Sequence, residues 1–523
     1  MEMTDSHGGA RRTTRRRFFV RQPRCGEASL YRQCARSRAI AALALSLACI
    51  GVAHADLDDP TLYFLDPNSP FNALEIASAQ ANQAVYNALT AKCAPAAAGR
   101  PSPCTAAELG TLAIATELVD TANQLLGGGP TGQSLGLDIT GLRLALRWTA
   151  ATEVAAIGAI NTKFAGNQLA GVANRLAALR GPAGGRFAAA SLGAPIDAAV
   201  ALASAQRPLG GGASADIGIA APFSMYVDDS YDFGTKSPTV LEDAFAYDGR
   251  EFTLGGDYRF SRYFVAGAVF GDSEKRVDFN SDLSTVDGNI HANGYSGILY
   301  GMFENDAFYL DLSAGLQRLS YDINRRISYP SLNPAISNVD STALSNTAST
   351  SLLSSMNLGY SAHFGAFGIE PHFGADYKNI RVDGFQEQAH LTSAPTVLTP
   401  YGVVITPQKI DSFELSAGLK MQVVWTSRIG VVVPYFNGVY HNQLSDKARH
   451  YTATYAAIAA DGFGPEASFL LATDPSPGHY FTVAGGISAV LPHGIQGYVQ
   501  YTRMLEYTNY TDQMVSGGIR IEF

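Results

Sequence analysis

The chain changes its pattern of apolar and polar positions near residue 223. Before that point, apolar residues recur at three- and four-residue steps, the period of a helix with one buried face. After it, apolar and polar residues alternate, the period of a strand with one apolar face. In the last segment, Val515, Ile519 and Ile521 share one face, whereas Ser516 and Arg520 lie on the other. We therefore predict a helical region followed by a large β domain.

The β domain contains about 12 segments with this alternation. They are 224–233, 246–260, 263–279, 289–304, 308–321, 350–364, 367–382, 410–426, 430–446, 477–491, 494–505 and 512–523. Their connections are alternately tight and mostly longer, which is typical of an outer-membrane barrel with short turns at one end and long loops at the other. In lipid, only a closed sheet satisfies every backbone group. The predicted fold class is an all-β transmembrane barrel of about 12 antiparallel strands, with a separate N-terminal α-helical domain. A soluble β domain would leave the alternation of loop lengths unexplained.

Residues 56–181 are predicted to form that helical domain. Thr105 and Glu108 fit a capping box at the start of a helix. A third helical region runs from about 141 to 179, with a break expected near Gly166, because glycine weakens a helix interior. The residues that follow, 182–222, are rich in Gly, Ala and Pro and form a predicted linker that could include a pore helix.

Two cysteines, Cys93 and Cys104, flank the loop between the first two predicted helices. An even pair suits an oxidising compartment, and we predict a disulfide between them. Closing a loop of about 12 residues would stabilise the domain by roughly 3 kcal/mol in the chain-entropy model. Two free thiols are the alternative, and a metal site is disfavoured because no histidine lies nearby.

The first 55 residues are predicted to be an extended secretory signal peptide. An Arg-rich stretch precedes the apolar run Ala39–Val52, and an Ala-His-Ala tripeptide ends at Ala55. This order predicts cleavage between Ala55 and Asp56, because signal peptidase sites carry small residues in that pattern. A core helix is the alternative interpretation of the apolar run.

Composition and charge exclude some classes of function. The formal net charge is −9, so no broad basic field exists to collect nucleic-acid phosphates. Charged residues make up 16 % of the chain, below the roughly 25 % of soluble globular proteins. The low charge suits a membrane barrel, in which several cations are expected to face the lumen or the loops. These cations are Arg318, Arg325, Arg326, Lys378, Arg381 and Lys420, with Asp311 and Glu414 as possible partners.

Candidate catalytic chemistry is sparse. Residues 56–222 contain no histidine, which removes a Ser-His-Asp triad and any histidine-ligated metal from this part of the chain. No family motif supports a hydrolase embedded in the barrel, so we predict no catalytic residue, no cofactor and no metal site. The candidates that such a hydrolase would use are His390, His450, Asp446, Asp461 and Asp474.

The order of signal peptide, helical segment, linker and barrel resembles the classical (type V) autotransporters. The likeness rests on FTLGGDYRFSRYFVAGAVFGDSEKRVDF (252–279), GYSGILYGMF (294–303), VVPYFNGVYHN (432–442) and the terminal GGIRIEF. It implies an integral outer-membrane protein with an autotransporter β-barrel over 223–523. It also implies that residues 56–181 are a passenger presented at the cell surface, and that the linker threads the pore.

The resemblance further implies partners and an assembly signal. Periplasmic chaperones would deliver the barrel, and the barrel-assembly machinery would insert it by recognising Phe523, Ile521 and Ile519. The barrel would be a monomer surrounded by outer-membrane lipid and lipopolysaccharide. Some members of the family cut themselves at an asparagine in the pore helix. Because no asparagine lies between Asn174 and the barrel, we expect no such cleavage.

The main alternative is a porin or channel built on the same barrel, with a periplasmic helical domain. A barrel-embedded hydrolase is the lesser alternative. The first two hypotheses differ in the location of residues 56–181, which would lie outside the cell in one and in the periplasm in the other.

Overall fold

The computed structural model describes residues 56–94, 102–180, 223–279, 286–305, 307–427, 430–445, 449–491 and 495–522. The chain divides into two compact units, Met1–His54 and Ala55–Phe523, and every described residue belongs to the second. The predicted signal peptide with Ala55, the linker 182–222 and Phe523 all lie outside the described residues.

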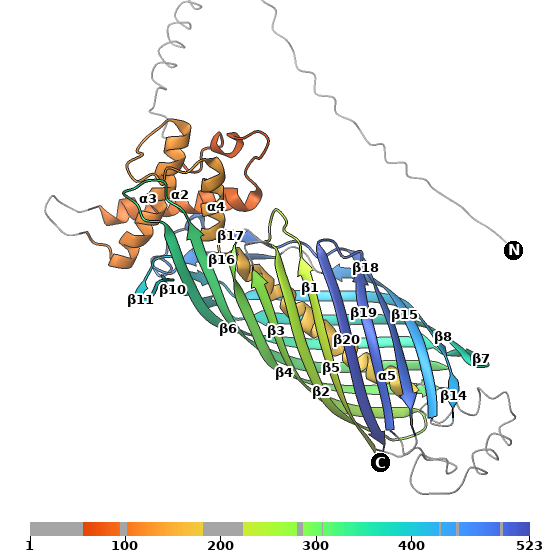
Figure 1. The fold of residues 1–523 in the computed structure, drawn as a ribbon. Coiled ribbons are helices and arrows are strands. Elements are labelled where there is room, and N and C mark those ends of the chain that lie inside the picture. Colours follow the sequence, from red (N-terminus) through yellow and green to blue (C-terminus); the bar gives the residue numbers. More distant parts are fainter. Residues whose placement is uncertain are drawn as a thin grey trace, which may run out of the picture. The chain divides into compact units, whose positions relative to one another are not determined.

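Twelve of the described strands form one closed antiparallel barrel (Figure 1). They are β1 (Phe223–Lys236), β2 (Phe245–Arg259), β3 (Phe264–Phe279), β4 (Asp287–Asn305), β5 (Phe308–Tyr329), β6 (Val339–Tyr360), β8 (Phe367–Val382), β13 (Gln408–Val423), β15 (Gly430–Ser445), β18 (His479–Val490), β19 (Ile495–Leu505) and β20 (Tyr510–Glu522). Strand β6 pairs with β8, and β20 pairs with β1 from Ser224 opposite Glu522 to Lys236 opposite Tyr510. The predicted fold class is confirmed, and the pairing of the last strand with the first closes the barrel.

The two ends of the barrel differ in their connections. Short turns lie at the end where β1 begins and β20 ends, and we call this the short-turn end. The longer connections lie at the opposite, long-loop end, and some of them form a second, four-stranded sheet of β9, β12, β16 and β17. The additional elements are β7 (Ala362–Phe364), β9 (Phe385–Gln386), β10 (Gln388–Leu391), β11 (Ala394–Leu398), β12 (Val403–Ile405), β14 (Trp425–Ser427), β16 (His450–Tyr455), η4 (Pro465–Ala467) and β17 (Phe469–Ala472).

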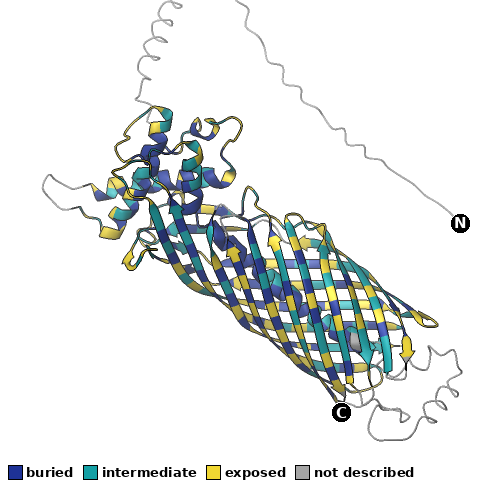
Figure 2. Cartoon of the chain, viewed as in Figure 1, coloured by how far each residue is buried: buried dark blue, intermediate teal, exposed yellow. Residues whose placement is uncertain are grey.

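Side chains alternate between the two faces of the barrel wall, as the stripes of exposed and buried residues in Figure 2 show. On β20, Val515, Ile519 and Ile521 are exposed on the outer face. Ser516 and Arg520 are buried on the inner face. The facing predicted for these residues of the last strand is therefore correct.

Strands β5 and β6 are longer than the sequence pattern indicates. The prediction ends the first at residue 321 and begins the second at residue 350, whereas they run to Tyr329 and from Val339. Beyond Leu316 the outer face of β5 turns polar, while its inner face stays apolar through Tyr321 and Ile323. The extra length is stabilised from the inside and extends the barrel beyond its apolar outer band.

The N-terminal region folds into helices that the sequence largely anticipates. The elements are η1 (Leu62–Phe64), α2 (Ala73–Cys93), α3 (Ala106–Leu126), α4 (Ile139–Thr149), η2 (Thr152–Val154) and α5 (Ala155–Arg180). The capping box of Thr105 and Glu108 begins α3, as predicted. The break expected near Gly166 is wrong, because α5 runs through it and the chain bends at Ala151, whose φ is 55°. A single interior glycine costs a helix only about 1 kcal/mol, so packing overrides it.

Residues 56–94 and 102–154 form what we call the helical cap. Helix α2 packs on α3 and α4, and it also contacts η4 and β17 in the long loops. Buried cap residues such as Val85 and Leu118 belong to the same apolar core as Tyr451 and Phe469 of the loops. The Tyr455 hydroxyl donates to Asn82 Oδ1 at 2.9 Å. The cap and the long loops therefore share one core.

Within the described residues, no helix combines the length and the apolar character needed to cross a membrane.

Candidate functional site: the barrel lumen

Helix α5 occupies the lumen of the barrel (Figure 1). It contacts the inner wall formed by β3, β4, β5, β6 and β8. The sequence pattern instead predicts that residues 155–180 belong to the passenger and that a pore helix could lie in 182–222, a segment outside the described residues. Within the described part of the chain, α5 is the segment that fills the pore.

An apolar stripe on α5 packs against the inner wall. Leu169, Val172 and Leu176 are buried together with Val269 and Ile298. Burying apolar side chains inside a barrel stabilises the helix in place, at roughly 25 cal/mol for each Å² removed from water. The helix is enclosed by protein, which agrees with its Ala-rich sequence and few charges.

Arg175 anchors the C-terminal half of α5 to the barrel. Its Nε lies 3.0 Å from Asp257 Oδ2, and its Nη2 donates to Ser224 Oγ at 2.8 Å. The Ser224 and Tyr300 hydroxyls also donate to Asp257, at 2.7 and 3.1 Å. The guanidinium carbon stands 4.5 Å from the centre of the Tyr226 ring. This buried carboxylate is thus satisfied by three different elements, α5, β1 and β4.

Arg180 makes a second anchor at the last residue of α5. It forms an ion pair with Asp311, and its Nη2 lies 3.5 Å from Glu370 Oε1. The Tyr309 hydroxyl donates to Glu370 at 2.7 Å, and the guanidinium stacks 3.5 Å from the Tyr309 ring centre. Because Tyr309 and Glu370 lie close to short turns, α5 runs from the cap to the short-turn end.

Polar contacts also hold the N-terminal half of α5. Lys163 pairs with Asp512 on β20. Ser296 Oγ donates to Gln168 Oε1 at 2.7 Å, and Gln168 Nε2 donates to Ser273 Oγ at 3.2 Å. Polar or charged residues are therefore matched between the helix and the wall along most of its length.

A cavity of about 110 Å³, lined by both polar and apolar residues, remains beside the C-terminal half of α5. It borders the wall of β13, β15, β18, β19, β20 and β1, opposite the strands on which the helix leans. Polar residues that line it include Asp228, Lys420, Tyr435, Asn437, Gln500 and Arg520.

A buried charge network joins the cap to the mouth of the barrel. Arg325 on β5 pairs with Glu387, with Nη2 and Oε2 2.6 Å apart, and donates to the Trp148 carbonyl of the cap at 3.0 Å. Both carboxylate oxygens of Glu153 lack a hydrogen-bond partner. Burial raises the pKa of Glu153 to about 8, against the opposing effect of Arg325 and with help from Asp243 and Glu387. Glu153 is therefore mostly neutral at pH 7.

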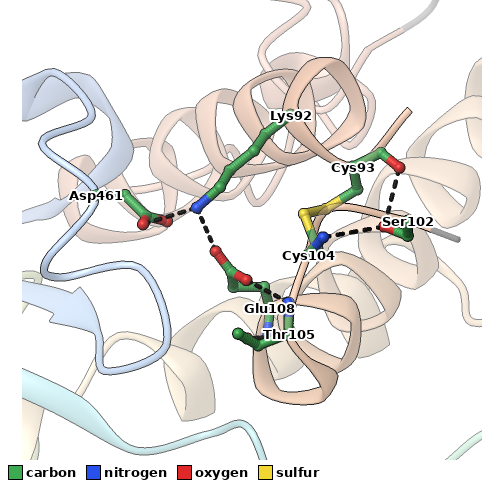
Figure 3. The surroundings of a disulfide bond; sticks show 7 residues. All are labelled: Lys92, Cys93, Ser102, Cys104, Thr105, Glu108 and Asp461. Atoms are coloured by element: carbon green, nitrogen blue, oxygen red, sulfur yellow. Dashed lines mark hydrogen bonds and ion pairs between the residues drawn. A yellow bond between two sulfur atoms is a disulfide. The ribbon is translucent and has the colours of Figure 1, made fainter. Parts of the chain in front are cut away.

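The disulfide region lies where the cap meets a long loop (Figure 3). Cys93 and Cys104 are joined in the structure. Beside them, Lys92 Nζ bridges Glu108 and Asp461, the latter at 2.7 Å. The hydrogen bond from Lys92 lowers the pKa of Glu108 to about 2, with help from the Thr105 amide. The bridge ties the start of α3 to the loop before β17.

The candidate hydrolase residues are not brought together as a site. His390 lies on β10 in the large sheet, whereas His450 lies on β16 in the small one. Asp461 pairs with Lys92, and Asp474 pairs with Lys236. Asp446 lies outside the described residues. Among the described residues, no group of three or more His, Cys, Asp or Glu could hold a metal.

The structure corrects two inferences made from the sequence, one about outward arginines and one about asparagines in the pore. Arg318 and Arg381 do not face the lumen, because both are exposed on the outer face of β5 and β8. The expectation of no self-cleavage used the segment after Asn174, but α5 carries Asn161, Asn167 and Asn174 inside the barrel. The ground for that expectation is removed, and the expectation itself stays a prediction.

The anchoring role of Arg175 and Arg180 was not predicted from the sequence. Their partners on β2, β5 and β8 lie at least 82 residues away in the chain. A weak signal was available, since Arg in an Ala-rich helix needs an acidic partner when it is buried. Together, the buried ion pairs and the apolar stripe fix α5 inside the lumen of the barrel.

Comparisons with known proteins agree with this architecture. The family model of the autotransporter β-domain matches residues 230–502. No curated protein sequence matches the chain. The chain is also similar to three solved structures. Because all three have TM-scores below 0.5, the family assignment rests on the family model alone. They are the translocator domain of the autotransporter NalP from Neisseria meningitidis (15 % identity, 58 % of this chain and 89 % of that chain, TM-score 0.44), the β-domain of the Bordetella autotransporter BrkA (13 %, 58 % and 100 %, 0.39) and the transport unit of AIDA-I from Escherichia coli (13 %, 62 % and 95 %, 0.35).

Proposed function

The chain belongs to the autotransporter β-domain family, and on that premise we propose that this outer-membrane autotransporter displays its helical cap at the cell surface, docked on its own barrel. The observation that carries the proposal is the core shared by the cap and the long loops. In outer-membrane barrels the long loops face outside and the short turns face the periplasm. A cap that packs on the long loops is therefore an external domain.

The path of the chain supports export. Helix α5 begins at the cap and ends with Arg180 near the short-turn end, where β1 also begins. The polypeptide thus crosses the barrel through its lumen between the cap and the first strand. This is the path of a segment whose N-terminal side has been moved across the membrane.

The docking contacts favour display over release. Lys92 pairs with Asp461, and Arg147 pairs with Asp243 at 2.6 Å. The Asn333 side chain donates to the Ser134 carbonyl at 2.8 Å. Because these ionic and polar contacts surround an apolar core, the cap has a specific seat on the long loops.

The porin alternative is disfavoured by the filled lumen, since α5 and its ion pairs occupy the space that a solute would cross. We include the absence of catalysis in the proposal. The purified protein is expected to show no turnover of ester or peptide substrates, and measurable turnover that depends on His390 or His450 would contradict this part.

Topology mapping tests the proposal. An epitope inserted at Ala96, between the two cysteines, should bind antibody on intact cells. A matched epitope between Gly365 and Ala366, in a short turn, should bind only after the outer membrane is permeabilised. If the Ala96 epitope also required permeabilisation, the cap would be periplasmic and the export proposal would be wrong.

A further inference from the structure

The outer face of the barrel carries an apolar groove of about 440 Å³ on β4, β5, β6 and β8. Its floor is made of small residues, among them Ala314 and Ala375, and its sides are larger residues such as Leu299, which is 69 % exposed. Every outward residue here lies in the apolar band that faces lipid. The groove is therefore a recess for something apolar. Six of its lining residues are Leu299, Leu312, Ala314, Met356, Ala375 and Tyr377.

The strand register continues this groove toward the long-loop end. Leu316 and Leu352 face each other on β5 and β6, two residues beyond the groove floor. The next outward row consists of Arg318, Thr350 and Arg381, which are neighbours across β5, β6 and β8. The two arginines flank one strand, so their Cα atoms are about 10 Å apart. On β5 and β6 an apolar track thus ends at a pair of cations, while β8 places Asn379, which donates to Asp411, beside Leu352 in the same row.

These two cations are available for a ligand. Within the described residues, neither Arg318 nor Arg381 makes an ion pair or a hydrogen bond through its guanidinium, and both are exposed. The adjacent Lys409 differs, because it pairs with Asp411 at 2.7 Å. Two unpaired guanidinium groups beside a hydroxyl match the geometry of a phosphate, which accepts bidentate bonds from arginine.

A second groove on the same wall lacks this arrangement. It measures about 340 Å³ and is bordered by outward residues of β8, β13, β15 and β18, including Phe373, Tyr440 and Phe481. The next outward positions toward the long loops are Asn442 and His479. A groove on the outer wall of this barrel is therefore not always followed by a pair of arginines.

We propose that the face of β4, β5, β6 and β8 binds one phosphorylated lipid. An acyl chain lies in the groove, Leu316 and Leu352 line its path, and the phosphate is held between Arg318 and Arg381 with the Thr350 hydroxyl as a third donor. Because the site lies on the long-loop side of the apolar band, the lipid belongs to the outer leaflet in the orientation proposed above. A phosphorylated glycolipid of the lipid A type has the required chemistry.

Lipid retention tests this site on the full-length protein. The purified chain is reconstituted in phosphatidylcholine bilayers that contain diphosphoryl lipid A, re-extracted with detergent, and assayed for bound lipid A. The wild type should retain about one molecule per chain, and Arg318→Gln/Arg381→Gln should retain at least tenfold less, since charge-assisted hydrogen bonds to two cations are lost. The control Arg250→Gln/Arg503→Gln removes two outward arginines from β2 and β19, of which Arg250 pairs with Asp229 at 2.9 Å, and should retain the wild-type amount.

Two further arms separate the parts of the site. Ala314→Phe fills the groove and should lower retention while the barrel still migrates as a heat-modifiable species. Dephosphorylated lipid A should be retained poorly, and millimolar inorganic phosphate should not displace the bound lipid. Equal retention by the Arg318→Gln/Arg381→Gln variant, or equal retention of dephosphorylated lipid A, would overturn the phosphate site. Displacement by inorganic phosphate would show an anion site without a lipid.

Discussion

At the scale of single residues, buried charges decide how the lumen is filled. Arg175 and Asp257 are both buried, and each is satisfied by hydrogen bonds in addition to the ion pair. A buried pair contributes little net stability but is costly to break, because removal of one partner leaves an uncompensated charge. Such pairs therefore fix where α5 lies more than they add to overall stability. By the same logic, a buried carboxyl without a hydrogen-bond partner, such as that of Glu153, is costly to ionise.

Glu153 should make the stability of the cap junction depend on pH. Its carboxyl group ionises near pH 8 in the folded chain but near 4.3 in an unfolded chain. The folded state holds an extra proton between these values, so stability falls as pH rises from about 4.3 to about 8. Glu153→Gln keeps the shape and removes the ionisation. The thermal midpoint, followed by fluorescence of the nearby Trp148, should therefore fall less between pH 5 and pH 9 in the variant than in the wild type.

The control for this experiment is the exposed Glu466, whose substitution by Gln should leave the pH dependence of the wild type intact. Parallel midpoint curves for wild type and Glu153→Gln would show that the carboxyl group ionises in the folded state without a cost, contrary to its burial.

At the scale of elements, α5 is a plug whose arginines are held by carboxylates of the barrel wall. Arg175→Asp/Arg180→Asp places carboxylates against Asp257 and Asp311, so repulsion replaces both anchors. We expect the helix to leave its seat and the single-channel conductance in planar bilayers to rise at least several-fold. Gly171→Ala on the same helix is the control, because an added methyl group would meet nothing within 4 Å.

Unchanged conductance in the Arg175→Asp/Arg180→Asp barrel, with its assembly intact, would mean that the apolar stripe alone keeps the helix in place. The two arginines would then be solvated charges inside the lumen instead of anchors.

The last strand carries a separate prediction about assembly. Strand β20 pairs with both β1 and β19, so it closes the barrel. Ile519 and Ile521 face outward on it, and the role of Phe523 as the end of the assembly signal remains a prediction. Deletion of Phe523 should lower the amount of heat-modifiable barrel in outer membranes, whereas Phe523→Tyr should keep it. Equal amounts of assembled barrel after the deletion would refute the role.

The elements also show where sequence reasoning works and where it stops. Alternation and turn length are local, so the strands and the pairing of β20 with β1 could be predicted. The position of α5 could not, because a helical period indicates a helix and says nothing of what surrounds it. The partners of Lys163 and Arg175 lie far away in the chain. The outward orientation of Arg318 could have been predicted from the sequence, because Leu316, two residues earlier on the same strand face, already lies on the lipid side.

At the scale of the whole molecule, the disulfide joins the end of α2 to the start of α3 and so stabilises the helical cap. Cys93→Ser/Cys104→Ser should lower the stability of the cap by roughly 3 kcal/mol, the chain-entropy value for a loop of this length. The measurement is resistance of the cap to protease in increasing urea. Heat-modifiability of the barrel should not change, because the twelve paired strands do not depend on the loop.

Mild reduction of the wild type supplies the control for that variant and should shift the protease profile by the same amount. A cap that resists protease equally with and without the disulfide would place its stability in the contacts with the long loops.

The core shared by the cap and the long loops limits how this protein can diversify. Removing the cap, or replacing it with an unrelated domain, would expose Tyr451, Phe469 and Leu471, which are now buried. Contiguous apolar surface of that kind promotes aggregation. The barrel is therefore not a general carrier for foreign cargo. Its cap and its loops have to be inherited together, and a change of shape on one side requires a matching change on the other.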